Sequence, residues 1–115
     1  MRVPVSIPIG GRNVRVEYLE QVFDDDGITP LSGATVGDPV YIQISMTENK
    51  SPDAIKATLY HEMCHVAFEL TGHHELLTEQ QEEAIVVALE SMLSPVLAFQ
   101  TKVGIKYREV EFPWE

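Results

Sequence analysis

The sequence predicts an α+β fold in which a small, mostly antiparallel sheet packs against two main helices. Through the first third of the chain apolar residues alternate with polar ones, which is typical of half-buried strands. From residue 52 the apolar residues recur every three or four positions, as on an amphipathic helix, and after residue 101 they alternate again. With 115 residues the chain is long enough for one domain and too short for two, so residues 1–115 are expected to form a single domain.

Three segments in the first 46 residues have the pattern of strands. Residues 2–9 (RVPVSIPI) contain two prolines, which lack the amide donor of a central strand, so this segment is expected at a sheet edge or as an extended arm. Residues 12–22 (RNVRVEYLEQV) and 39–46 (PVYIQISM) are expected to be regular strands because their apolar residues alternate. Residues 24–38, which are rich in aspartate and glycine, are expected to form a loop.

The first helix is expected at residues 52–71. Ser51 is a favoured N-cap residue, Pro52 suits the first helical position, and Gly72 suits the residue after the last turn. The apolar residues at intervals of three and four are Ile55, Leu59, Met63, Val66 and Leu70. The caps and the period therefore agree on one helix of about 20 residues.

A second helix is expected to begin after Thr78 and to end or bend near Pro95. Its first turns carry several glutamates, which suit the positive end of a helix dipole. Its buried stripe is expected at Ile85, Ala88, Leu89 and Met92. Residues 102–112 (KVGIKYREVEF) are expected to add a last strand, and Trp114 to pack near the chain end.

The composition argues against two classes of partner. The chain carries 18 acidic and 8 basic residues, a net charge of −10, so a phosphate backbone would be repelled and no nucleic-acid partner is expected. No apolar run approaches the roughly 18 residues that cross a bilayer, so no membrane partner is expected either. The N-terminus lacks the apolar stretch of a signal peptide, and Cys64 is the single cysteine, which together favour a cytoplasmic protein.

The segment TLYHEMCHVAFE (Thr58 to Glu69) carries two histidines four residues apart, His61 and His65, with Glu62 directly after the first. Residues at this spacing lie about 40° apart on one helix face, so their imidazoles can reach one ion. A catalytic zinc site uses three protein ligands and leaves a fourth position to water. Glu62 lies about 100° around the helix, where its carboxylate can take the proton of that water. The spacing predicts a metal site with Glu62 as general base.

The third metal ligand must come from another part of the sequence. Metzincins have a third histidine where this chain has Thr71, so that pattern is excluded. Glu83 is favoured, because a carboxylate beside an apolar stripe is poorly explained by the helix dipole. Glu82 remains an alternative, and so do His73 and His74 if the chain turns back tightly after the first helix.

These motifs carry a family resemblance. A strand, the helix with TLYHEMCH and a second helix with EEAIVVALESMLSP resemble the gluzincin metallopeptidases, most closely the small ImmA/IrrE-like group often encoded by bacteriophages and mobile elements. The resemblance covers roughly residues 40–96 and implies a minimal zincin-like domain whose first helix carries HExxH. The chain differs from the usual pattern of that group at Cys64, where glycine is common, and at Ile85, where asparagine is common.

The resemblance also implies the cofactor and the residue roles. Zn²⁺ would be held by His61, His65 and Glu83, and Glu62 would act as the general base. The implied activity is hydrolysis of peptide bonds through a metal-activated water, with a peptide or narrow protein substrate, in the cytoplasm of the host if the chain is phage-encoded. The alternative is a catalytically inactive zinc-binding module for interaction between phage and host.

Two further roles are open at the level of sequence. Residues 40–46 can offer a strand edge to an extended peptide. The candidates to stabilise an oxyanion are His73, His74, Tyr60 and Tyr107.

Overall fold

The computed structural model describes residues 1–100 and 104–115, and the side chains of residues 1–90 and 104–115. The chain forms a small sheet and two long helices, which confirms the predicted α+β class. The elements are β1 (Arg2–Ile9), β2 (Arg12–Leu19), β3 (Val22–Phe23), β4 (Pro30–Leu31), β5 (Gly33–Val36), β6 (Tyr41–Ser45), α1 (Pro52–Thr71), the 3₁₀ turn η1 (His73–Leu76), α2 (Glu79–Gln100) and β7 (Lys106–Glu109).

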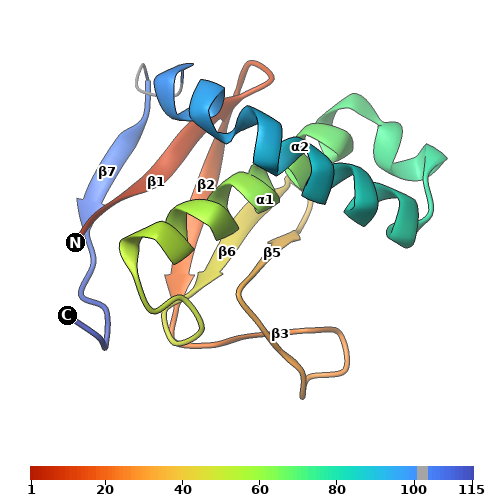
Figure 1. Ribbon diagram of the computed structural model, residues 1–115. Coiled ribbons are helices and arrows are strands. Elements are labelled where there is room, and N and C mark those ends of the chain that lie inside the picture. The colour runs from red at the N-terminus through yellow and green to blue at the C-terminus, as the bar shows by residue number, and fades with distance from the viewer. Residues whose placement is uncertain (101–103) are drawn as a thin grey trace.

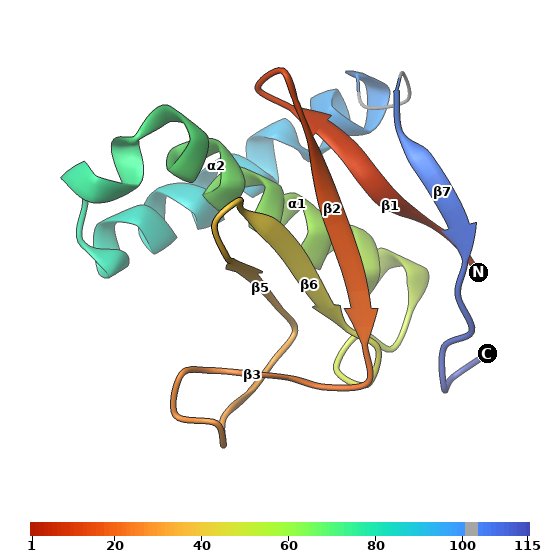
Figure 2. The ribbon, with the colours of Figure 1, turned by 180° about the vertical axis from the view of Figure 1, so that it is seen from behind.

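Five strands form the main sheet in the order β5-β6-β2-β1-β7. All neighbouring pairs are antiparallel except β2 and β6, which run parallel, so the sheet is mostly antiparallel as predicted. Both helices lie on one side of the sheet (Figures 1 and 2). α1 packs on the strands, whereas the described contacts of α2 are mainly with α1.

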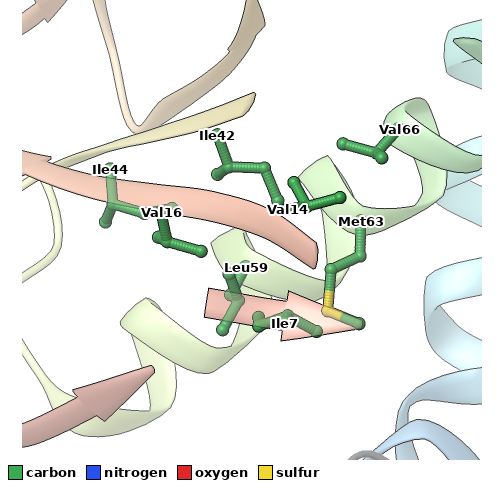
Figure 3. Packing of buried hydrophobic residues seen from close by; sticks show 8 residues of the cluster. All are labelled: Ile7, Val14, Val16, Ile42, Ile44, Leu59, Met63 and Val66. Atoms are coloured by element: carbon green, nitrogen blue, oxygen red, sulfur yellow. The ribbon is translucent and has the colours of Figure 1, made fainter. Parts of the chain in front are cut away.

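The main hydrophobic core lies between the sheet and α1 (Figure 3). Its strand residues alternate along the chain and its helix residues recur at three and four, as both periods predicted. The eight buried residues of this cluster are Ile7, Val14, Val16, Ile42, Ile44, Leu59, Met63 and Val66. The core thereby fixes which face of α1 turns away from the sheet toward α2.

The prediction for residues 2–9 was wrong, because β1 is an inner strand between β2 and β7. Its second half, Ser6–Ile9, pairs with β2, and its first half pairs with β7 up to an irregularity between Pro4 and Ser6. Each half therefore has a bonded neighbour mainly on one side. This half-and-half pairing accommodates Pro4 and Pro8, which lack an amide donor.

Residues 24–38 are not the continuous loop that their composition indicated. A two-stranded hairpin, β3 with β4, encloses a turn in which Asp26 accepts hydrogen bonds from the amides of Ile28 and Thr29. The segment Gly33–Val36 then forms β5, the edge strand beside β6. As a consequence β6 lies inside the sheet, and the expectation that residues 40–46 offer a free strand edge was wrong.

α1 has the bounds that the sequence predicted. The side chain of Ser51 accepts a hydrogen bond from the amide of Ala54 at 3.1 Å, and Pro52 begins the helix. Gly72 follows the last turn with a φ of 76°, a conformation that favours glycine, and its amide donates to Glu69 O. Both helix ends are thus defined by local capping interactions, and residues 61–65 lie in the middle of the helix.

α2 begins as predicted, but its buried face is different. Thr78 and Gln81 exchange hydrogen bonds in a capping box. The helix continues past Pro95 to Gln100, so of the end or bend predicted near Pro95 the end was wrong. Val86 is fully buried, whereas Ile85 and Ala88 of the predicted stripe are exposed and Leu89 is half-buried. The predicted burial of Met92 lies outside the described side chains.

The C-terminal segment confirms two smaller predictions. β7 pairs with β1 as the last strand, but it spans Lys106–Glu109, which is shorter than the predicted 102–112; residues 102 and 103 lie outside the described residues. The Trp114 ring stacks on Phe112 with centroids 5.3 Å apart. Trp114 also donates from Nε1 to the carbonyl oxygen of Asn49. Among the described residues no helix is long and apolar enough to cross a membrane.

Candidate metal centre

His61 and His65 lie on the side of α1 that faces α2, whereas Glu62 faces the edge strand β5. The helical spacing places the two imidazoles side by side, with ring centroids 5.0 Å apart. Both rings are largely covered, since their side chains are 23% and 16% exposed. The two imidazoles therefore lie next to each other on α1, and Glu83 of α2 contacts both.

Glu83 of α2 completes the predicted trio. One of its carboxylate oxygens lies 2.9 Å from His61 Nε2 and the other lies 2.9 Å from His65 Nε2. One donor atom from each of the three residues can be chosen so that all lie within 4.8 Å of one another. The structure thus brings together the group that sequence reasoning favoured, and this group could hold a metal ion.

The other nitrogen of each ring also has a carboxylate partner. His61 Nδ1 lies 2.5 Å from Glu90 Oε2, and His65 Nδ1 lies 2.5 Å from Glu82 Oε2. A carboxylate at Nδ1 fixes the orientation of an imidazole and holds its proton there, which leaves Nε2 to a metal. Glu82 and Glu90 therefore contact the two imidazoles at Nδ1, on the side opposite the Nε2 atoms that could hold a metal.

Sequence reasoning missed these two orienting roles. Glu82 was an alternative metal ligand, but its carboxylate contacts Nδ1 of His65 and not the Nε2 side. Glu90 had no explanation from the helix dipole because it lies three turns into the helix. An acidic residue that deep in an apolar helix is the signal that could have indicated a partner.

Glu62 is the most deeply buried member of the motif, at 6% exposure. The Thr35 hydroxyl, on β5, donates to Glu62 Oε1 at 3.0 Å and so holds the carboxylate from the sheet side. Burial raises the pKa of the Glu62 carboxyl, and the hydrogen bond from Thr35 opposes that rise. A carboxylate with a raised pKa beside a metal-binding group is suited to accept a proton.

A cavity of about 220 Å³ adjoins these residues. It is lined by Thr35, Glu62, His65, Glu69, His74, Glu79, Glu82 and Glu83. A larger apolar pocket, of about 380 Å³, lies against the other side of α1 and includes Cys64 and Phe68. We place the candidate site at the smaller cavity, because polar groups converge there and the larger pocket is lined almost entirely by apolar residues.

The four residues that were candidates to stabilise an oxyanion line three different cavities. His74 lines the site cavity and bonds through Nδ1 to Glu82 Oε1 at 2.7 Å, which raises the pKa of its imidazole. His73 bonds to Thr71 and lines the apolar pocket instead. Tyr60 and Tyr107 line a third pocket over β1. Of the four candidates for stabilising an oxyanion, only His74 lines the site cavity.

Cys64 packs in the described structure as a small, buried side chain. It is 8% exposed and carries a free thiol. Burial raises the pKa of this thiol, which disfavours the nucleophilic thiolate. Its position on the pocket side of α1 keeps it out of the group formed by His61, His65 and Glu83.

Comparisons of the chain with protein-family models, with curated proteins and with solved structures give no match. The resemblance to gluzincins therefore stays a prediction from the sequence motifs alone.

Proposed function

We propose that the chain is a small zinc-dependent metallopeptidase of the gluzincin type, similar to the ImmA/IrrE-like group. The observation that carries the proposal is the position of Glu83, whose carboxylate spans Nε2 of both motif histidines. It is supported by the shared cavity, which Glu62 lines together with His65 and Glu83. The site then has the three components of the predicted chemistry, namely ligands, a base and space for a substrate.

The donor set fits zinc better than calcium or magnesium. Two imidazole nitrogens and one carboxylate oxygen suit Zn²⁺, whereas the harder cations prefer sites made of oxygen atoms alone. Donor atoms bound to one tetrahedral zinc lie roughly 3.4 Å apart, close to the 2.9 Å that separates the Glu83 oxygens from Nε2 of His61 and His65. Because the Glu83 side chain is 51% exposed, it can move the remaining distance without repacking a core.

Bound Zn²⁺ would supply a Lewis acid and lower the pKa of a water molecule in the cavity. Glu62 accepts the proton from that water as it attacks the scissile carbonyl, and later delivers the proton to the leaving amine. The Thr35 hydroxyl keeps the Glu62 carboxylate oriented during both transfers. Glu82 and Glu90 keep the two imidazoles in the tautomer that binds a metal through Nε2.

The substrate we propose is an extended peptide or an extended segment of a protein. β5 is the edge strand of the sheet and supplies the hydroxyl that contacts Glu62, so a peptide paired with this edge would run past the base. This replaces the strand of residues 40–46 as the proposed docking edge.

A metal-binding module without catalytic activity is the second candidate. The observation that favours it is the hydrogen bond between Thr35 and Glu62, since an engaged and buried carboxylate can serve the packing of β5 on α1 instead of proton transfer. In that case the metal would tie α1 to α2, and the partner would be another protein.

The test combines metal content with peptide cleavage. Purified wild-type chain, His61→Ala, Glu83→Ala and Glu62→Gln are loaded with Zn²⁺, desalted and measured by mass spectrometry of the metal. We expect about one zinc per chain in the wild type and in Glu62→Gln, and a large loss in the other two variants. Each is then incubated with a mixed peptide library, and only the wild type should produce cleaved peptides.

The outcomes separate the candidates. Zinc retained without cleavage in the wild type favours the metal-binding module. Equal cleavage by Glu62→Gln would contradict the assigned role of the base. No zinc in the wild-type chain at saturating metal would overturn both candidates.

A further inference from the structure

Glu82 has an unusual environment for a carboxylate. It is only 5% exposed, and its two oxygens bond to two different imidazoles. Oε2 lies 2.5 Å from His65 Nδ1, and Oε1 lies 2.7 Å from His74 Nδ1. A buried carboxylate is stable only when its oxygens have such partners, so both contacts are needed to keep this side chain in place.

We propose that His74 is a positioning residue of the metal centre. It holds the buried carboxylate of Glu82, and Glu82 in turn orients the His65 ring toward the metal. The inference rests on the metal-binding part of the proposed function and does not depend on catalysis. It assigns a role to a histidine that is neither a ligand nor a part of the HExxH motif.

The conformation of the chain between the two helices places His74 next to Glu82. Gly72, with its positive φ, turns the chain sharply after α1, and the η1 turn then places His74 beside Glu82 of α2. His74 Nε2 also lies 3.4 Å from Glu69 Oε1 on α1. The ring therefore lies between a carboxylate of each long helix, at the end of the site cavity.

Loss of the His74 ring should weaken metal binding indirectly, because it removes the partner that holds Glu82 in place. Without this ring, no described residue donates a hydrogen bond to Glu82 Oε1 at a nearly buried position, and leaving it unpaired costs more than the bond itself contributes. The side chain of Glu82 then gains by turning toward water, and that movement removes the partner of His65 Nδ1. Removing the hydrogen-bond partner of a metal-binding histidine typically weakens metal affinity by 10- to 100-fold. Because His74 acts on His65 only through Glu82, we expect the loss of affinity in its variant to be about 10-fold.

His73 provides a matched control in the adjacent position. It has the same chemistry and lies on the same η1 turn, but its Nδ1 bonds to the Thr71 hydroxyl and its side chain lines the apolar pocket on the other side of α1. A general effect of removing a histidine from this turn would appear in both variants, whereas the proposed role predicts an effect in one.

The experiment measures Zn²⁺ affinity by competition with a chromophoric chelator. We expect His74→Ala to bind Zn²⁺ about 10-fold more weakly than the wild type, and His73→Ala to bind it equally well. His74→Asn should recover most of the affinity, because the amide nitrogen of asparagine can donate to Glu82 Oε1 from nearly the position of Nδ1. The visible absorption of the Co²⁺-loaded chains should shift in His74→Ala and return in His74→Asn, and melting of the metal-free chains checks that each variant is folded.

Three results would overturn the inference. Unchanged Zn²⁺ affinity in His74→Ala overturns it alone, while the proposed function stands. Equal weakening in His74→Ala and His74→Asn assigns the effect to packing of the ring and overturns the hydrogen-bonding role. A wild-type chain that binds no Zn²⁺ overturns both this inference and the proposed function, and is recognised by the absence of competition at every metal concentration.

Discussion

Glu62 receives its one described side-chain hydrogen bond from a residue that no motif indicates. Thr35 lies on a short edge strand in a segment whose composition predicts a loop, so its hydroxyl could not be assigned to the site from the sequence. The spacing of His61 and His65 was sufficient to predict that they share a helix face, because helix geometry alone decides it. Contacts between distant segments, such as Thr35 with Glu62, depend on a strand order that local patterns do not contain.

Thr35→Val tests the role of this hydroxyl. Valine has nearly the same shape as threonine but cannot donate a hydrogen bond, so Glu62 loses its orientation while the metal-binding group is untouched. We expect Zn²⁺ content equal to that of the wild type and a kcat lowered by roughly 10-fold for any peptide the wild type cleaves. Thr35→Ser keeps the hydroxyl and should keep the rate; a valine variant with full activity would show that Glu62 needs no help from β5.

Gly33→Ala tests how closely β5 approaches α1. A Cβ at this position would lie 2.7 Å from Thr58 Cγ2, 3.0 Å from Gln43 O and 3.3 Å from Glu62 Cγ. Either β5 or the side chains that face it must shift to admit the new Cβ, and we expect the free energy of unfolding to fall by about 1–3 kcal/mol in urea titration. Stability equal to that of the wild type would mean that the edge strand moves freely away from the helix.

At the scale of the elements, α1 and α2 differ in how far sequence patterns could predict them. In α1 the caps and the apolar period agree, and the predicted bounds were correct. In α2 the face toward α1 carries Glu82, Val86 and Glu90, so acidic side chains occupy positions where the period of a core helix would place apolar ones. The apolar residues that remain define a stripe on the wrong side, which explains the wrong prediction for Ile85 and Ala88.

The N-cap of α1 gives a prediction about an element as a unit. The Ser51 hydroxyl oxygen accepts from the Ala54 amide, and loss of such a cap typically costs about 1 kcal/mol. Ser51→Ala should lower the free energy of unfolding by about that amount in chemical denaturation, and Ser51→Asp should restore it. An alanine variant with wild-type stability would indicate that packing alone holds the first turn in place.

For the whole molecule, the candidate metal centre is also a structural connection. α2 packs mainly against α1, and the described polar contacts between the two helices gather around His61 and His65. The sheet class and the core between strands and α1 could be predicted because alternation and helical period specify buried faces. That the described contacts of α2 are mainly with the first helix could not be predicted, since no local pattern states which layer a helix will cover.

Zn²⁺ should therefore stabilise the fold. A ligand that binds only the folded chain adds about 2.7 kcal/mol at a free concentration 100 times its Kd. We expect the Tm of the wild type in calorimetry to rise with added Zn²⁺ and the Tm of His61→Ala to stay unchanged. A rise of equal size in both chains would show that the metal acts elsewhere on this acidic surface, whose net charge is −10.

The contacts of Glu83 with both imidazoles also have a consequence for the rate at which the site would take up an ion. The Glu83 carboxylate lies against the two Nε2 atoms that an incoming ion would have to reach, so this side chain would have to rotate for an ion to enter. Because the side chain is half-exposed on the helix surface, the swing needs only rotation about its own bonds, a motion of picoseconds to nanoseconds. On the proposed function, metal uptake would therefore be limited by arrival of the ion and loss of its hydration shell, without separation of α1 from α2.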